Sequence, residues 1–213
     1  MPSFQALVDF GKQFYERGWM QGTAGNLSVK LKSQPLEIII TPSGVNKGHL
    51  SMTDLITVGE PASGSKNDKP SAETVIHQAI YRAVPEATSV LHVHPIYSTL
   101  ISGLYGHAKE IRRQPLEWVE MLKGIGVPET DNAELTILPN WQDVHLVARD
   151  LAEVLKHSKK PLPAVLIYNH GLTAWGKTPE EARNHLEIVE YVCQLIYFKN
   201  LALPSPGLRP PSP

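Results

Sequence analysis

The sequence predicts an α/β sandwich in which helices pack against the faces of a mostly antiparallel sheet. Three observations lead to this fold class. The chain has 213 residues, of which 42% are hydrophobic, so it can bury one sizeable core. Helical and strand-like stretches follow one another in the order helix, several strands, helix, strand, helix, strand, helix. The strand-like stretches are short and separated by turn residues, and no internal repeat is visible.

The first half of the chain is predicted to contain two helices with short strands between them. Residues 3–18 carry apolar side chains at spacings of three and four, the pattern of an amphipathic helix. Three strand-like runs follow, with turns such as "GTAGN" and "TPSG" among them, at 26–31, 36–41 and 55–58. Residues 59–70 are expected to form a polar loop or a hairpin extension. A second helix is expected over 70–85, with Ser71 as its cap and Glu73 in its first turn.

The second half is predicted to alternate strands with helices. The expected strands are 89–98, 134–139 and 164–171, and the expected helices are 143–158 and a last one from Thr178 to about Lys199. Residues 117–126 are expected to form a short helix or a helical turn. Thr178, Pro179 and Glu181 give that last helix a capping box with proline in the first helical position. We therefore expect one domain over residues 1–200. The proline-rich tail, 201–213, cannot continue the helix and is expected to be extended or disordered.

Composition narrows the class of protein. The formal net charge is −1, and lysine and arginine do not cluster, which argues against a nucleic-acid surface or a polybasic membrane anchor. Apolar runs such as "AVLIY" are far too short to span a bilayer, and the N-terminus lacks the pattern of a signal peptide. The lone cysteine, Cys193, cannot form an internal disulfide and is expected in the core. A soluble cytoplasmic protein is the prediction.

Two polar strand ends are the candidate site. In "SVLHVHPIYS", His92 and His94 alternate with Val93, so the two imidazoles share one face of a strand. They are either the first ligands of a metal or two histidines satisfied by hydrogen bonds at a strand end. In "AVLIYNHG", a hydrophobic strand again ends in a histidine, His170, followed by Gly171. Three neutral imidazoles converging there would leave coordination positions open, as in a catalytic zinc centre.

Five short motifs occur in the order seen in the class II aldolase/adducin-head family, which the chain resembles: "GTAGNLSVK" at 22–30, "TPSG" at 41–44, "PSAE" at 70–73, "HVHP" at 92–95 and "NHGLTAWG" at 169–176. The resemblance covers roughly residues 4–199. It implies a class II aldolase-like three-layer sandwich that forms a homo-oligomer, with a tetramer favoured. It also implies one Zn²⁺ per subunit, held by His92, His94 and His170.

Within the family, "EMLKGIG", "PNWQD" and the tryptophan of "HGLTAWG" look most like the dehydratases of methionine salvage. This resemblance implies a zinc-dependent lyase that dehydrates 5-methylthioribulose 1-phosphate to 2,3-diketo-5-methylthiopentyl 1-phosphate. One carboxylate could take the C3 proton and then protonate the departing C4 hydroxyl. Glu120 matches the acid/base position of the dehydratases and is the expected acid/base. Glu73 matches the catalytic glutamate of the aldolases, where some dehydratases carry cysteine. It is a second acid, a helper that orients water or metal, or a favourable charge at a helix N-terminus.

The phosphate of such a substrate would suit the glycine-rich and serine-rich turns, because their N–H groups and hydroxyls can bind an anion. The candidate contacts are Thr23, Gly25, Asn26, Ser43, Gly44, Ser71 and Ala72. Each turn taken singly is also compatible with an ordinary loop. Lys47 is a further candidate, although an exposed lysine is more often simply solvated.

Two other functions stay open. A sugar-phosphate aldolase or pentulose-phosphate 4-epimerase would keep the metal and use Glu73, whereas a non-catalytic, adducin-like interaction module could lose the metal ligands altogether. The remaining histidines lack partners at ligand spacing and are interpreted as surface or ordinary packed residues: His49, His77, His107, His145, His157 and His185.

Overall fold

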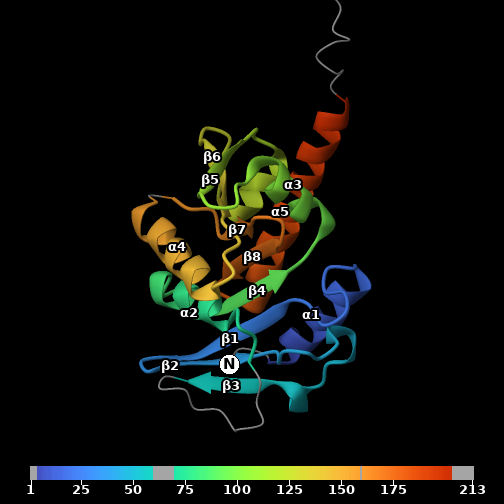
Figure 1. Cartoon of the computed structure of the whole chain (residues 1–213), viewed down its shortest axis with the longest axis vertical. Helices are drawn as coiled ribbons and strands as arrows, with labels where there is room; N and C mark the ends of the chain where they lie inside the picture. Colours follow the sequence, from blue (N-terminus) through green and yellow to red (C-terminus); the bar gives the residue numbers. More distant parts are fainter. Residues whose placement is uncertain (1–3, 60–69, 159, 203–213) are drawn as a thin grey trace, which may run out of the picture.

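The computed structural model describes residues 4–59, 70–158 and 160–202 (Figure 1). The strands are β1 (Asn26–Ser33), β2 (Leu36–Ile40), β3 (Ile56–Gly59), β4 (Ser89–Val93), β5 (Arg112–Leu116), β6 (Ala133–Leu138), β7 (Ala164–Ile167) and β8 (Gly171–Gly176). The helices are α1 (Phe4–Glu16), α2 (Thr74–Ala83), α3 (Ile96–Tyr105), α4 (Val144–His157) and α5 (Pro179–Ala202), with 3₁₀ turns η1 (Lys47–His49), η2 (Met52–Asp54) and η3 (Glu120–Ile125). The strands form a single sheet in the order β3-β2-β1-β4-β8-β7-β6-β5.

The sheet is mixed, although most of its strand pairs are antiparallel as expected. The one parallel pair within the described residues is β6 with β7, and the other neighbours run antiparallel. The parallel pair arises because α4 carries the chain from the end of β6 back to the start of β7. A sequence pattern of short strands does not reveal such a crossover by itself.

Helices cover both faces of the sheet and complete three layers (Figure 1). On one face, Leu91 and Val93 of β4 belong to a core that also contains buried residues of α1, α3 and α5. On the other face, Val90 packs in a core shared with α2 and α4. This alternation places the next residue of that second face, His92, on the side of the sheet that α2 covers.

The expected strand 89–98 is wrong in its second part. β4 ends at Val93, and the chain then enters α3, for which Pro95 is the N-cap residue in an extended conformation. Proline has no N–H group to donate to a neighbouring strand, which accounts for the end of pairing there. The apolar residues after Pro95 follow the helical spacing of α3, which the sequence analysis did not recognise. His94 therefore lies in the connection just beyond the strand.

The expected strand 164–171 is also shorter than predicted. β7 ends at Ile167, and a turn that contains Asn169 with φ 49° leads directly into β8. Asparagine adopts this left-handed conformation more readily than most residues. His170 ends the turn, so it is held between two paired strands. Neither β8, as a strand separate from β7, nor β5 was predicted from the sequence.

The second expected helix begins later than predicted. α2 starts at Thr74, with Glu73 as its N-cap residue, although Ser71 still caps the turn by accepting a hydrogen bond from the N–H of Glu73 at 3.2 Å. The short helix or helical turn expected over 117–126 is present as the 3₁₀ turn η3. The last helix extends past Lys199 to Ala202.

Residues 60–69 of the expected loop and 203–213 of the expected tail lie outside the described residues. Among the described helices, none combines the length and the apolar character that crossing a membrane requires.

Candidate metal centre

Three polar side chains lie in a row across the middle of the sheet. In the register of β1, β4 and β8, Asn26 is opposite His92, and His92 is opposite Thr173. Directly opposed residues of neighbouring strands project to the same face, so an amide, an imidazole and a hydroxyl are adjacent. Their exposed fractions are 2%, 1% and 0%. Buried polar groups within an apolar sheet need a structural or functional reason, and these three lie beside a cluster of possible metal ligands.

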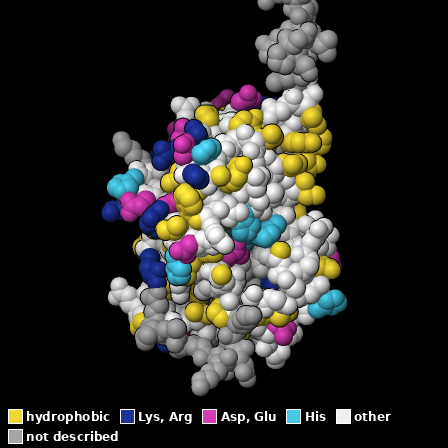
Figure 2. Space-filling model, viewed as in Figure 1, with side chains coloured by type: hydrophobic (Ala, Val, Ile, Leu, Met, Phe, Trp, Pro, Cys, Tyr) yellow, Lys and Arg dark blue, Asp and Glu magenta, His cyan; other side chains and the backbone are white. Residues whose placement is uncertain are grey.

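Four side chains with metal-binding atoms converge beside this row. One ligand atom from each of Glu73, His92, His94 and His170 lies within 4.8 Å of all the others. The Nε2 atoms of His92 and His94 are 2.9 Å apart. Oε1 of Glu73 lies 3.3 Å from Nε2 of His92 and 3.1 Å from Nε2 of His170. The structure thus brings together the three histidines that the sequence singled out and adds Glu73, and Figure 2 shows histidine and acidic side chains gathered at the centre of the viewed face.

The connections at the strand ends hold two of the histidines. The backbone N–H of His94 donates to a carbonyl of the segment before β1, and the carbonyl of His170 accepts from Oγ1 of Thr99 in α3 at 3.1 Å. At Gly171 a Cβ atom would come within 2.4 Å of the Val93 carbonyl oxygen and 2.9 Å of Cδ2 of His94. Glycine is required at this position because the backbone of β8 passes so close to the histidine-bearing strand end.

Thr173 fixes the orientation of the His92 ring. Its Oγ1 lies 2.9 Å from Nδ1 of His92. When Nδ1–H donates to the hydroxyl, Nε2 keeps a lone pair directed at the other three groups, which is the arrangement of metal-ligating histidines with an outer partner. Thr173 could not be predicted from the sequence, because its place opposite His92 depends on the pairing of β8, a strand that the sequence pattern does not separate from β7.

Glu73 is held in the cluster by contacts from both sides. Nδ2 of Asn26 donates to its Oε2, while His92 and His170 contact its Oε1. Burial alone would raise the pKa of the Glu73 carboxyl, but the charge of His92 and hydrogen bonds from His170 and His92 outweigh it and hold this pKa well below its usual range. Glu73 is therefore a carboxylate, able to serve as a ligand or a base.

The donor set fits a divalent cation. Burial lowers the pKa of His94 to about 3, and the charges of His92 and His170 act in the same direction, so this imidazole is neutral and offers a lone pair. Two imidazole nitrogens that face each other at 2.9 Å are compatible when a proton or a cation lies between them. Three imidazoles and one carboxylate suit zinc and also iron, cobalt or manganese.

The three turns expected to bind phosphate are linked to one another. Nδ2 of Asn26 lies 3.3 Å from Oγ of Ser71, which joins the first turn to the third. Nζ of Lys47 donates to the carbonyls of Thr23 and Val45, which joins the first turn to the second. Of the two alternatives for Lys47, the exposed and solvated lysine is excluded, because its side chain is completely buried. The remaining phosphate candidates are half-buried or exposed, namely Thr23, Gly25, Ser43, Gly44, Ser71 and Ala72.

Glu120 is not among the four converging side chains. It lies at the start of η3, with 75% of its side chain exposed, and pairs with Lys123 on the same turn at 3.0 Å. The described structure therefore places Glu73, and not Glu120, in direct contact with the histidines.

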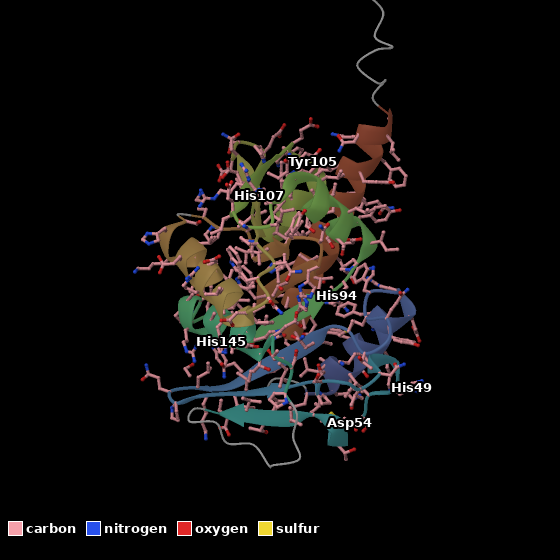
Figure 3. The ribbon with its side chains drawn as sticks, viewed as in Figure 1. His49, Asp54, His94, Tyr105, His107 and His145 are labelled. Atoms are coloured by element: carbon pink, nitrogen blue, oxygen red, sulfur yellow. The ribbon has the colours of Figure 1, made fainter. Side chains whose placement is uncertain are left out.

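The other histidines are not among the four converging side chains. Figure 3 shows His49, His107 and His145 on segments away from His94. His185 is buried, and its Nδ1 lies 2.6 Å from the Trp175 carbonyl, so it is a packed residue. His77 is completely buried, with Nδ1 2.6 Å from Oγ of Ser28.

Comparisons with known proteins show the family to which the chain belongs. The relatives include a "Probable bifunctional methylthioribose-1-phosphate isomerase/methylthioribulose-1-phosphate dehydratase" of Nocardia farcinica, 39% identical over 87% of this chain, which spans only 33% of that relative. Methylthioribulose-1-phosphate dehydratase of Microcystis aeruginosa is 37% identical over 88% of this chain and 91% of its own length. The solved structure of L-fuculose-1-phosphate aldolase from Thermus thermophilus covers 93% of this chain and 95% of its own, with 26% identity and a TM-score of 0.71. Residues 5–197 match a family model, and the chain belongs to that family, the Class II Aldolase and Adducin N-terminal domain family.

Proposed function

We propose that this chain is a zinc-dependent lyase that removes water from 5-methylthioribulose 1-phosphate and yields 2,3-diketo-5-methylthiopentyl 1-phosphate, a step of methionine salvage. The observation that carries the proposal is the convergence of Glu73, His92, His94 and His170 within 4.8 Å. The names of the relatives supply the substrate, because two of the most similar ones are called methylthioribulose-1-phosphate dehydratases.

His92, His94 and His170 would hold one Zn²⁺ per subunit, with Glu73 as a further ligand or as the group that orients a water. When bound, the ion would supply Lewis-acid polarisation of the substrate ketone and stabilise negative charge on its oxygen. A hydrogen bond donated by Nδ1 of His92 to Thr173 would keep the ring in the tautomer that this role needs. Asn26 keeps one oxygen of Glu73 in place.

The reaction requires two proton transfers by the chain's own carboxylates. A base takes the proton from C3 of the substrate, and an acid then protonates the C4 hydroxyl, which leaves as water while a C3–C4 double bond forms. The resulting enol loses the proton of its C3 hydroxyl and gains one at C4, which gives the second ketone. We assign both transfers to Glu120, whose exposed carboxylate is held only by Lys123 among the described residues, so no buried contact has to break. Glu73 is already engaged by three side chains.

The phosphate is proposed to bind at the three linked turns. Their contacts would be Thr23, Gly25, Asn26, Ser43, Gly44, Ser71 and Ala72. The links from Asn26 to Ser71 and from Lys47 to both neighbouring turns support this, because they hold the three segments side by side. Backbone N–H groups of glycine-rich and serine-rich turns suit an anion.

The chain is proposed to act as a homo-oligomer, with a tetramer favoured. Large apolar side chains are exposed along α3 and α5, and Figure 2 shows hydrophobic side chains along the upper right of the viewed face. These residues are Ile96, Leu100, Leu104, Tyr191, Phe198 and Leu201. Apolar surface of this extent is typical of subunit contacts. Light scattering coupled to gel filtration would give the mass, and a monomer would contradict this part of the proposal.

An aldolase is the second candidate, favoured by one observation. Glu73, the residue that corresponds to the aldolase glutamate, contacts two of the histidines, whereas Glu120 does not. The deciding experiment assays zinc-loaded protein with 5-methylthioribulose 1-phosphate, fuculose 1-phosphate and ribulose 5-phosphate in parallel. Turnover of the first alone supports the dehydratase. Cleavage of fuculose phosphate or epimerisation of the ribulose phosphate would overturn it, and no turnover with no bound metal would favour an interaction module.

A further inference from the structure

Lys47 is buried without a direct counter-ion in the described structure. It begins η1, just after the "TPSG" turn, and its exposed fraction is 0%. Helix α1 packs directly over it, since a Cβ on Gly11 would come within 3.2 Å of the Lys47 carbonyl and 3.7 Å of its Cβ. Burying an ammonium group costs free energy unless hydrogen bonds or an opposite charge compensate for the lost hydration.

The ammonium group of Lys47 joins two turns. Nζ donates to the carbonyl of Thr23 at 3.1 Å and to that of Val45 at 2.8 Å. Thr23 belongs to the turn before β1, and Val45 follows the turn after β2. The third N–H of the group has no partner among the described residues, and no carboxylate among them lies within ion-pair distance of Nζ.

Among the described residues, no carboxylate neutralises the charge of Lys47 by direct contact. Both of its partners are neutral carbonyls, and the carboxylate whose charge bears on it is Glu73. Burial lowers the pKa of Lys47 to about 8, against the effect of Glu73, so the group is still mostly protonated at neutral pH. A cation that lacks a direct counter-ion adds to the anion affinity of backbone N–H groups nearby.

We propose that Lys47 is a positioning residue for the anionic end of the substrate: it fastens the 22–26 turn to the 41–45 turn and supplies the positive charge that a bound phosphate requires. The inference deepens the proposed function, since it assumes a phosphorylated substrate. Lys47 itself is not assigned a part in proton transfer or in metal binding.

The test compares Lys47→Met, which keeps the length of the side chain and removes its charge, with Lys30→Met. Lys30 is a matched control, because its Nζ also donates to a backbone carbonyl, that of Pro85. For Lys47→Met we expect KM for the phosphorylated substrate to rise about tenfold or more, with kcat within about twofold and zinc content unchanged. Lys30→Met should leave both constants as in the wild type.

Inorganic phosphate gives a readout that does not depend on turnover. Phosphate should raise the melting temperature of the wild type and of Lys30→Met, and the rise should be absent in Lys47→Met. If the Met variant does not fold, Lys47→Gln, which keeps amide donors without charge, replaces it with the same expectations. An unchanged KM together with an intact phosphate effect would overturn the inference, as would a wild type that phosphate does not stabilise. If the wild type binds phosphate through Lys47 but does not dehydrate the substrate, the proposed function fails and the inference about anion binding stands.

Discussion

Nδ1 of His92 lies 2.9 Å from Oγ1 of Thr173, the residue directly opposite it on β8. Two neighbouring strands therefore cooperate to orient one candidate ligand. The hydroxyl holds the ring so that its other nitrogen, Nε2, faces His94 and Glu73. An outer partner of this kind restricts the ring to one tautomer and one rotation, which lowers the entropic cost of binding a cation.

The first prediction concerns this contact. Thr173→Val keeps the shape of the side chain and removes the hydroxyl, so zinc affinity should fall by about 10- to 100-fold. Competition with a chromogenic chelator would measure the change. Thr136→Val, at another buried threonine of the same sheet, is the control and should keep wild-type affinity. Equal affinity in the Thr173 variant would show that the hydroxyl does not orient the ligand.

The second prediction concerns the close approach of β8 to the histidines. Gly171→Ala places a Cβ 2.4 Å from the Val93 carbonyl oxygen, a backbone atom that cannot move aside alone. We expect the free energy of unfolding to fall by about 1–3 kcal/mol, and zinc affinity to fall with it. Urea titration of the metal-free proteins would measure the first effect. At Gly124 the new Cβ would meet only the tip of the Ile188 side chain, so Gly124→Ala should lower the free energy of unfolding by less than Gly171→Ala. A larger loss for Gly124→Ala would contradict this geometry.

The third prediction concerns acid stability. Burial lowers the pKa of His77 to about 3, and the charge of His92 adds to this effect, against Glu73. Between this value and the ordinary one, 6.5, the unfolded chain binds a proton at His77 that the folded chain does not, so stability falls as pH falls through that window. From pH 6.5 to 5 the contribution is about 2 kcal/mol. In urea titrations of the metal-free proteins, the free energy of unfolding should fall less between pH 6.5 and 5 for His77→Gln than for the wild type. An equal fall in the two proteins would contradict this prediction.

The fourth prediction separates the two carboxylates. Glu120→Gln should lower kcat by about 10²-fold or more and leave zinc content unchanged. Glu73→Gln should weaken zinc binding, because Glu73 contacts two of the ligands. Glu117→Gln is the matched control, since it also removes an exposed carboxylate that pairs with a lysine, Lys199. Intact turnover in Glu120→Gln, with turnover abolished in fully zinc-loaded Glu73→Gln, would transfer the acid/base role to Glu73.

Several parts of this fold could be predicted from sequence because local spacing determines them. The amphipathic pattern at the N-terminus matches α1, and the capping box at Thr178 marks the start of α5. The alternation of His92 with Val93 correctly indicated that the histidine points away from the core that contains Val93. Histidines at the ends of two apolar strands made His92, His94 and His170 candidates, and the family resemblance implied them as a ligand set.

Other parts depend on pairing between distant segments, which local patterns do not encode. The contact of His92 with Thr173 requires the β4–β8 register, and the place of Glu73 depends on α2 packing beside β1. The burial of Lys47 could not be read from a lysine in a glycine-containing turn, because it results from α1 packing over that turn. Strand β5 contains two arginines and a proline and lies at the edge of the sheet, so it lacks the apolar alternation of a strand.

The most direct test is anomalous X-ray diffraction at the zinc absorption edge, on crystals of protein purified with zinc. We predict one strong anomalous peak per subunit, within coordination distance of Nε2 of His92, His94 and His170 together. Ordered crystals that show these three side chains but carry no such peak, or that carry zinc only at other residues, would contradict the metal centre on which the proposed lyase depends.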